Sequence, residues 1–177
     1  MHRLFVGLRP PLAMRSIILS QMGGVPGGRW QTDDHLHVTL RFIGEVDRPL
    51  AEDVAAALGS VRHRPLDLQL GGVGCFDRKG RIDSLWVGIG PEVEVRSLHL
   101  AVGRALERVG IAPDQRAFVP HITIARFSRA NAPVAALPIA SLSPPSVTAH
   151  FDHFLLYESH LGSEGPIYEV VERYPLA

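Results

Sequence analysis

The spacing of apolar residues along the chain separates helices from strands. Apolar residues recur every three or four positions in residues 47–61 and 91–110, and they are spread through residues 10–22, which begin with two prolines. This spacing gathers apolar side chains on one face of a helix, so we expect all three segments to be helical. Asp47 is a suitable N-cap for the second segment, and Gly110 is a suitable end for the third.

Alternation of apolar and polar residues predicts strands elsewhere. It occurs in residues 66–70, in residues 147–159, which we expect to form one strand, and in a last strand from Tyr168. Residues 131–146 are rich in proline, alanine and serine, and we expect a loop or irregular extended chain there.

Two segments repeat in the same order along the chain. Residues 3–8, RLFVGL, resemble residues 84–89, SLWVGI, and residues 37–40, HVTL, resemble residues 121–124, HITI. Each half therefore runs strand, helix, histidine-containing strand. We expect residues 1–177 to form a single domain built from two fused pseudo-repeats, related by a local two-fold axis.

The composition is that of a globular chain without a net charge. Of 177 residues 46% are apolar, and 18 basic residues balance 18 acidic ones, so no global positive field draws in nucleic acid. The single cysteine, Cys75, excludes an intramolecular disulfide and a cysteine-based zinc site. No apolar run approaches the ~18 residues of a membrane span, and the N-terminus lacks the long apolar region of a signal peptide. We therefore expect a cytoplasmic protein that does not bind membranes.

The repeated histidine strands suggest a shared site. With regular alternation, His37, Thr39 and Arg41 lie on one polar face of the first strand, and His121 and Thr123 share a face of the second. A local two-fold axis would bring both sets to one groove. Two histidines can provide a neutral base and a cationic acid, and threonine hydroxyls can donate to phosphate oxygens. This set suits in-line displacement at a strained phosphate ester, which needs no metal.

A metal site is the alternative interpretation of the first strand. His35 and His37 lie on one strand face, with Asp33 and Asp34 just before them, and this spacing can bind zinc or iron. The second half has Val119 at the position equivalent to His35. We therefore expect no metal and no other cofactor.

At these residues the chain resembles the 2H phosphoesterase superfamily. More narrowly, it resembles the RNA 2′,3′-cyclic phosphodiesterases of bacteria and archaea, historically called 2′-5′ RNA ligases. The resemblance covers essentially the whole chain. It is carried by RLFVGLRP, LHVTLRFIGEV, LWVGI, PHITIAR, LYES and GPIYEVVERYPL.

The resemblance implies a fold and an activity. The fold is α/β (α+β), with two pseudo-symmetric lobes whose antiparallel sheets and outer helices surround a central groove. The activity is the opening of an RNA 2′,3′-cyclic phosphate end to a 2′-phosphate, and members of the family can also join tRNA halves through a 2′-5′ bond.

The resemblance also implies roles for individual residues. His121 would be the general base and His37 the general acid, although the sequence alone leaves this assignment reversible. Thr39 and Thr123 would hold the non-bridging oxygens. Arg126 would bind phosphate, but regular alternation puts it opposite His121, so the strand must twist or bulge there or Arg126 must be structural.

Two further residues are candidates for substrate binding. Arg41 would reach the substrate from His37's face. Phe76 lies in GCFDRKGR, which we interpret as a loop and which holds the densest basic run, Arg78, Lys79 and Arg81. Phe76 would stack on a terminal base while these cations guide the RNA backbone. The alternative is a solvated hairpin tip with Phe76 tucked into the core.

Other functions are compatible with the same residues. One is a nucleotide- or RNA-binding module without turnover, and another is a phosphodiesterase for a different small cyclic phosphate or a 2′-5′ oligonucleotide. The expected partner is RNA with a 2′,3′-cyclic phosphate end or a small nucleotide. We expect the protein to be a monomer.

Overall fold

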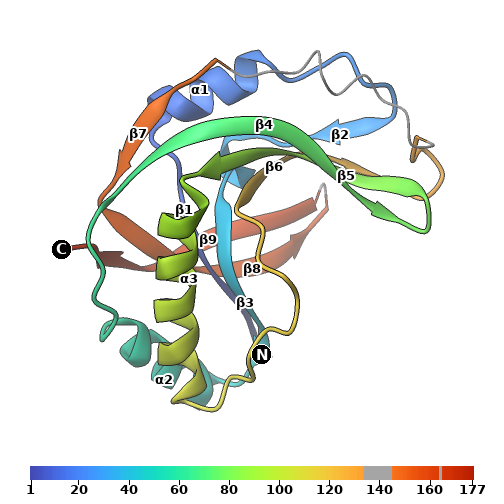
Figure 1. The fold of residues 1–177 in the computed structure, drawn as a ribbon. Helices are drawn as coiled ribbons and strands as arrows, with labels where there is room; N and C mark the ends of the chain where they lie inside the picture. The colour runs from blue at the N-terminus through green and yellow to red at the C-terminus, as the bar shows by residue number, and fades with distance from the viewer. Residues whose placement is uncertain (134–144, 164) are drawn as a thin grey trace.

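A computed structural model of the chain describes residues 1–133, 145–163 and 165–177. Its strands form a strongly curled sheet (Figure 1). The α-helices in these residues are α1 (Leu12–Ser20), α2 (Arg48–Leu58) and α3 (Glu92–Glu107), and a short 3-10 helix covers Asp33–His35. The three helices predicted from apolar spacing are confirmed.

The nine strands of the described residues all pair in antiparallel fashion. In chain order they are β1 (His2–Leu8), β2 (Gly28–Trp30), β3 (Val38–Val46), β4 (Leu66–Arg78), β5 (Arg81–Gly90), β6 (His121–Phe127), β7 (Thr148–Phe151), β8 (His153–Gly162) and β9 (Gly165–Pro175). Their order in the sheet is β7-β4-β5-β6-β3-β1-β8-β9, and β2 pairs with β6 at the side.

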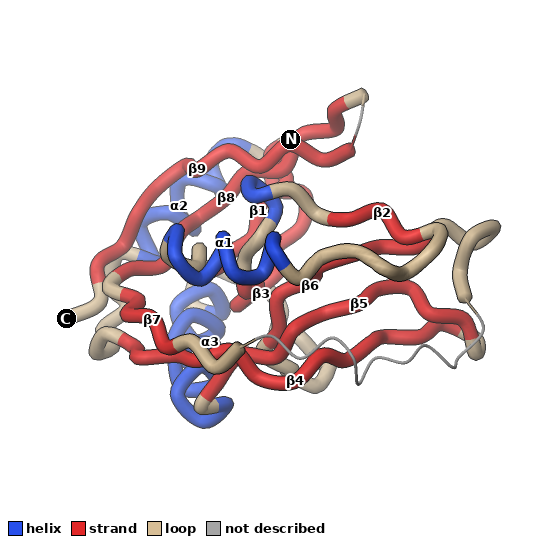
Figure 2. The backbone as a smooth tube through the Cα atoms, turned by 90° about the horizontal axis from the view of Figure 1, so that it is seen from above, coloured by secondary structure: helices blue, strands red, loops and turns tan. Residues whose placement is uncertain are grey.

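This strand order is symmetric about the contact between β6 and β3. The repeated strands β5 and β1 lie one position outward on either side, and β4 and β8 lie one position further. The β4–β5 and β8–β9 hairpins extend to the same side of the molecule, away from α2 and α3 (Figure 2). The expected architecture of two pseudo-symmetric antiparallel lobes is confirmed.

Two sequence-based expectations about strands are wrong. Residues 147–159 form two strands, because the chain leaves β4 in one lobe at Asp152 and then pairs with β1 in the other. The segment GCFDRKGR is mostly strand, since β4 runs to Arg78 and only Lys79 and Gly80 form the turn, with φ of 56° and 75°. Of the predicted loop at 131–146, residues 134–144 lie outside the described part of the chain.

The helices cover one face of the sheet and leave the other to the site. Helix α2 packs on β1 and α3, and α3 packs on β3 and β5. The Asp47 carboxylate accepts a hydrogen bond of 3.0 Å from the Leu50 amide and begins α2 as predicted. Gly110, with φ of 89°, follows the end of α3.

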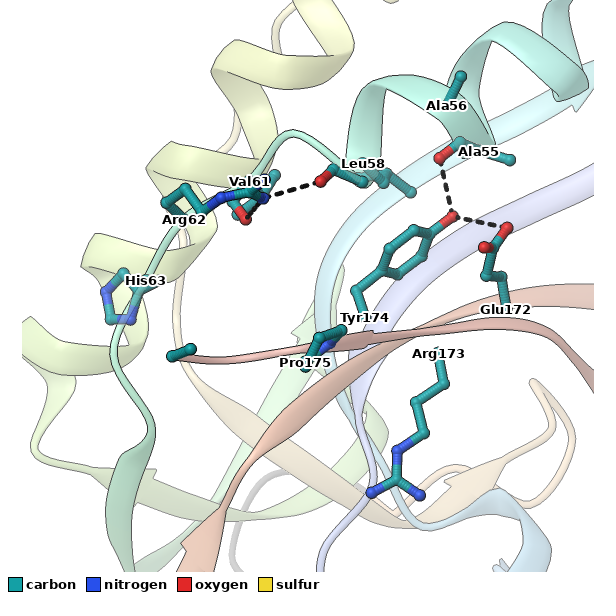
Figure 3. A pocket seen from close by; sticks show the side chains of 12 residues that line it. Ala55, Ala56, Leu58, Val61, Arg62, His63, Glu172, Arg173, Tyr174 and Pro175 are labelled. Atoms are coloured by element: carbon teal, nitrogen blue, oxygen red, sulfur yellow. Dashed lines mark hydrogen bonds between the residues drawn. The ribbon is translucent and has the colours of Figure 1, made fainter.

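The last strand is fastened to α2 by a buried tyrosine. The Tyr174 hydroxyl donates a 3.0 Å hydrogen bond to the carbonyl of Ala55 (Figure 3). Burial raises the pKa of Tyr174 well above its usual value, so it stays a neutral donor. This contact anchors the C-terminal strand on the helical face.

Candidate active site

The two histidine motifs meet at the centre of the sheet. Val38 of β3 pairs with Ile122 of β6, so the middle residue of one His-x-Thr motif lies beside that of the other. Because side chains alternate, His37 and Thr39 flank Val38 on the opposite, groove face. His121 and Thr123 flank Ile122 in the same way.

A β-bulge follows the motif on β3. Thr39 pairs with Gly7 of β1. Val6, which precedes Gly7 in the antiparallel strand β1, pairs with Arg41. Leu40 is therefore an extra residue that has no partner on β1.

The same bulge occurs on β6. Thr123 pairs with Trp86 of β5. Leu85, which precedes Trp86 in the antiparallel strand β5, pairs with Ala125. Ile124 is therefore the extra residue on β6. An extra residue shifts the alternation of side chains by one, which moves every following side chain to the other face.

The bulge on β6 brings Arg126 into the groove. Arg126 is exposed on the face of His121 and Thr123, whereas Ile124 and Ala125 are both buried. The sequence left open whether the strand twists, whether it bulges or whether Arg126 is structural. The structure shows a bulge before Arg126. The Arg126 guanidinium is close enough to lower the pKa of both histidines.

The bulge on β3 takes Arg41 out of the groove face. Arg41 is 5% exposed, and its Nη2 donates to the carbonyl of Ala112. The expectation that Arg41 shares a strand face with His37 is therefore wrong, because it assumed regular alternation through Leu40. Arg41 nevertheless lines the cavity of about 450 Å³ that adjoins His121, and its role in substrate binding stays a prediction. Phe42, which is 53% exposed, takes the groove position that is equivalent to Arg126.

Both histidines are held in the same tautomer by backbone carbonyls. Nδ1 of His37 lies 2.8 Å from the carbonyl oxygen of His35, and Nδ1 of His121 lies 2.6 Å from that of Val119. A carbonyl oxygen only accepts, so each Nδ1 carries the hydrogen. Each Nε2 is thereby left as the atom that can take up or release a proton. Position 35 thus has a counterpart after all, through its main-chain oxygen.

Burial and a nearby cation favour the neutral form of both rings. Burial lowers the pKa of His37 to about 4; the hydrogen bond to His35 opposes this shift, and the positive charge of Arg126 adds to it. Burial also lowers the pKa of His121, and Arg126 contributes there too. In the free protein at neutral pH, both Nε2 atoms are therefore proton acceptors.

Aromatic rings enclose each histidine. Phe5 lies 5.0 Å from His37 between ring centroids, and Tyr168 meets the same ring edge-on at 5.3 Å. On the other side, Phe76 meets His121 edge-on at 4.9 Å. Phe76 is half-buried and forms part of the groove wall. It is therefore neither buried in the core nor at the tip of a free loop.

Trp86 completes this enclosure at 5.8 Å from His121. Sequence reasoning did not name Phe5, Trp86 or Tyr168 as site residues. The repeat contained a signal for two of them, because Phe5 and Trp86 occupy the same position in LFVGL and LWVGI.

A cavity of about 450 Å³ adjoins His121 and opens the groove along β3 and the β4–β5 hairpin. Its walls include Thr39, Phe42, Phe76 and Arg78. This volume suits a small ligand of nucleotide size. The wall combines aromatic surface with cationic and hydroxyl groups.

His35 is engaged elsewhere and does not join His37 as a ligand. Its Nε2 donates to the Pro166 carbonyl at 2.6 Å, and its Nδ1 accepts from the Thr32 hydroxyl at 3.0 Å. Asp33 pairs with Arg9 and Arg15, which lower the pKa of its carboxyl, Arg15 most strongly. The described residues contain no group of three histidine, cysteine or acidic side chains arranged to hold a metal ion.

The family model of the 2′-5′ RNA ligase superfamily matches residues 24–163. The chain belongs to this superfamily. The match spans both histidine motifs and the strands β2 to β8 that position them.

Named relatives of this superfamily and a solved structure agree with this assignment. A protein of Aeropyrum pernix named RNA 2′,3′-cyclic phosphodiesterase is 34% identical over 142 residues, which are 78% of this chain and 81% of that protein. One of Archaeoglobus fulgidus with the same name is 31% identical over 170 residues, 94% of this chain and 96% of that protein. The crystal structure of E. coli LigT with 3′-AMP superposes with a TM-score of 0.82 at 26% identity, covering 99% and 98% of the two chains.

Another cavity of this 2′-5′ RNA ligase superfamily member lies between α2 and the end of β9 (Figure 3). It has a volume of about 460 Å³, and its wall includes Arg62, His63 and Glu172. Both His63 nitrogens are within hydrogen-bonding distance of other groups, the Arg64 carbonyl and the Ser97 hydroxyl. This cavity shares no lining residue with the groove cavity.

None of the α-helices in the described residues is long and apolar enough to cross a membrane.

Proposed function

We propose that this chain opens the 2′,3′-cyclic phosphate end of RNA to a 2′-phosphate by acid–base catalysis with two histidines and without a metal. In this proposal residues 1–177 act as one domain, and each pseudo-repeat supplies half of the site. The relatives named RNA 2′,3′-cyclic phosphodiesterase support the reaction class. The observation that carries the proposal is the pair of equivalent histidines whose Nδ1 atoms are tied to carbonyls, leaving two Nε2 atoms for proton transfer.

The proposed reaction is an in-line attack of water on phosphorus. Nε2 of His121 takes a proton from the water as its oxygen bonds to phosphorus. The bond between phosphorus and the ribose O3′ breaks, and Nε2–H of His37 gives its proton to O3′. The products are a 2′-phosphate monoester and a free 3′-hydroxyl. A five-membered cyclic phosphate is strained, and this strain lowers the activation barrier that the site must overcome.

The remaining groove residues hold the phosphate in this proposal. Thr39 and Thr123 donate hydroxyl hydrogen bonds to the non-bridging oxygens, and Arg126 balances their charge. Phe76 offers a ring on which the terminal base stacks, since it already borders His121. E. coli LigT forms a complex with 3′-AMP, a nucleotide of the size that this groove would take.

Because the pKa of His37 is low in the free protein, this ring must become protonated when the substrate binds. The free ring is neutral, whereas a general acid must be protonated. A phosphodiester carries a negative charge, and an opposite charge at close range raises the pKa of a histidine. Binding of the substrate therefore prepares the acid. A 5′-hydroxyl in place of water would give a 2′-5′ bond by the same steps, which is the proposed route to ligation.

The test uses a nucleoside 2′,3′-cyclic phosphate with His37→Ala and His121→Ala, in excess EDTA. Each variant is expected to lose at least about a hundredfold in kcat while its circular dichroism spectrum is unchanged. His150→Ala is the matched control, because this exposed histidine pairs with Asp67 on β4 and is not part of the groove. A near wild-type rate in either groove variant, or loss of wild-type activity in EDTA with recovery on added zinc, contradicts the proposal.

A further inference from the structure

The two hairpins that border the groove differ in the charged side chains that they expose, and Asp67, Asp77 and Asp83 on the β4–β5 hairpin balance its three cations in number. The β4–β5 hairpin exposes Arg78, Lys79 and Arg81 at its end. Across the groove, the described residues between 158 and 172 contain no lysine or arginine, and their charged residues are glutamates with one histidine. These glutamates are Glu158, Glu169 and Glu172.

A fourth cation joins the basic hairpin from another strand. Arg129 follows β6 and, with Arg78, Lys79 and Arg81, lines a cavity of about 420 Å³. The four cations therefore face a common space although they come from two separate parts of the chain. We call this set the basic hairpin surface.

Nearby carboxylates form no ion pair with this surface in the described residues. Within the described residues, none of its four cations forms an ion pair or a side-chain hydrogen bond. Asp77 instead accepts from the Gly80 amide at 3.2 Å and stabilises the turn. Asp83, half-buried at a bulge of the hairpin, is the carboxylate among the described residues that line the 420 Å³ cavity. Elsewhere arginines such as Arg15 and Arg64 are paired with acids.

The basic hairpin surface continues into the catalytic groove. Arg78 and Asp83 line both the 420 Å³ cavity and the 450 Å³ cavity that contains His121 and Phe76. Along β4, Phe76 and Arg78 are two residues apart, or about 7 Å at the rise of a strand, and Lys79 follows in the turn. A strand of RNA whose terminal base rests on Phe76 would thus reach these cations with its next phosphates.

We propose that the basic hairpin surface binds the phosphates of single-stranded RNA on the 5′ side of the cyclic end. This inference rests on the proposed function, because a 2′,3′-cyclic phosphate is the 3′ end of a chain and leaves only one direction for the rest of it. The β8–β9 hairpin offers no comparable cluster of cations, because Arg29 lies singly against its turn at Gly165 and Arg173 lies near the end of β9, so the RNA leaves the groove over the β4–β5 hairpin. The substrate class is therefore an oligonucleotide rather than a mononucleotide.

This arrangement sets the salt dependence of binding. With no net charge on the chain, the local surface supplies the attraction for the RNA backbone. Each phosphate contact on a single strand contributes about −0.7 to the slope of log K against log salt, so four contacts predict a slope of about −3.

The test compares two triple variants that remove equal charge. The hairpin variant is Lys79→Gln, Arg81→Gln and Arg129→Gln; Arg78 is kept because it also lines the catalytic groove. The helix variant is Arg48→Gln, Arg62→Gln and Arg104→Gln, three exposed positions on or beside α2 and α3. Fluorescence anisotropy measures the Kd for a labelled eight-nucleotide RNA that ends in a 2′-phosphate, at several salt concentrations.

The hairpin variant is expected to raise Kd about tenfold or more, and to make the salt slope shallower by about 2. The helix variant is expected to leave both within twofold of wild type. An unchanged Kd in the hairpin variant, or an equal loss in the helix variant, overturns the proposal. The assay needs no turnover, so a protein that binds RNA through the hairpin but opens no cyclic phosphate would refute the proposed function alone. Circular dichroism verifies the fold, and Lys79→Gln alone repeats the test with a minimal change.

Discussion

Leu40 and Ile124 are 84 residues apart, and each is the extra residue of a β-bulge directly after a His-x-Thr motif. Both are buried, and both shift the side-chain alternation of their strand. Through this shared irregularity the two lobes present Phe42 and Arg126 at equivalent places in the groove. The scaffold is therefore symmetric while the chemistry at its two ends differs, with an aromatic ring on one side and a cation on the other.

The close approach of β1 to the first motif makes Gly7 a sensitive position. A Cβ at Gly7 would lie 2.9 Å from the Val38 carbonyl oxygen and 3.7 Å from Cδ2 of His37. Gly88 is its counterpart in the other lobe, and there a Cβ would lie 3.3 Å from the Gly72 carbonyl oxygen. We expect Gly7→Ala to lower the free energy of unfolding by about 1–3 kcal/mol, and to lower kcat, because β3 must shift.

Gly88→Ala is the matched control for that substitution. Its closest contact is looser, so we expect a smaller loss of stability in urea denaturation and a smaller loss of kcat. A larger effect at Gly88 than at Gly7 would show that the packing between β1 and β3 does not fix His37.

Removal of the Arg126 charge should change the titration of both histidines. The guanidinium lowers the pKa of His37 and of His121, so Arg126→Met is expected to raise both values. NMR titration of the two imidazoles measures this directly. In the same variant kcat should fall about a hundredfold, the usual cost of losing one group that stabilises developing charge.

Arg104→Met, an exposed substitution on α3, serves as its control and should leave both titrations unchanged. If Arg126→Met leaves the two pKa values in place, the bulge on β6 does not bring this guanidinium to the histidines.

The lowered pKa values predict an acidic optimum for kcat/KM. This parameter reports free enzyme and requires one histidine neutral and one protonated. The pKa of His37 is about 4 and that of His121 lies below its ordinary 6.5. The required state is therefore most populated below pH 6.5 and is lost as pH rises through both values. Because bound phosphate raises the pKa of His37, the profile of kcat should lie at higher pH than that of kcat/KM.

Initial rates across the range from about pH 4 to about pH 9 measure both profiles, because this range brackets the titration of histidine. An optimum of kcat/KM above about pH 7 would contradict the proton assignment that the buried histidines imply.

The sequence predicted the parts of this fold that depend on local spacing. Helices α1, α2 and α3 followed from apolar spacing, and the Asp47 cap from the preference of such residues for helix starts. The two-lobed arrangement followed from the repeat of LFVGL and the His-x-Thr motif. These signals are local, or are copies of local signals, and so they survive in a single sequence.

The sequence could not predict what depends on register between strands. The bulges at Leu40 and Ile124 leave no mark in composition, yet they decide that Arg126 lies on the groove face of its strand and that Arg41 does not, although Arg41 still lines the cavity beside His121. The break at Asp152 likewise depends on β7 and β8 pairing with strands of different lobes. Tyr168 reaches His37 only because β9 folds back along β8.

The product of one turnover distinguishes the proposed two-histidine reaction from its alternatives. A short RNA that ends in a 2′,3′-cyclic phosphate is incubated with the protein in excess EDTA, and the product is identified by ³¹P NMR. We expect a 2′-phosphate with a free 3′-hydroxyl, formed by wild type and by neither His37→Ala nor His121→Ala. A 3′-phosphate product, or a 2′-phosphate formed equally well without either histidine, would contradict the proposed reaction.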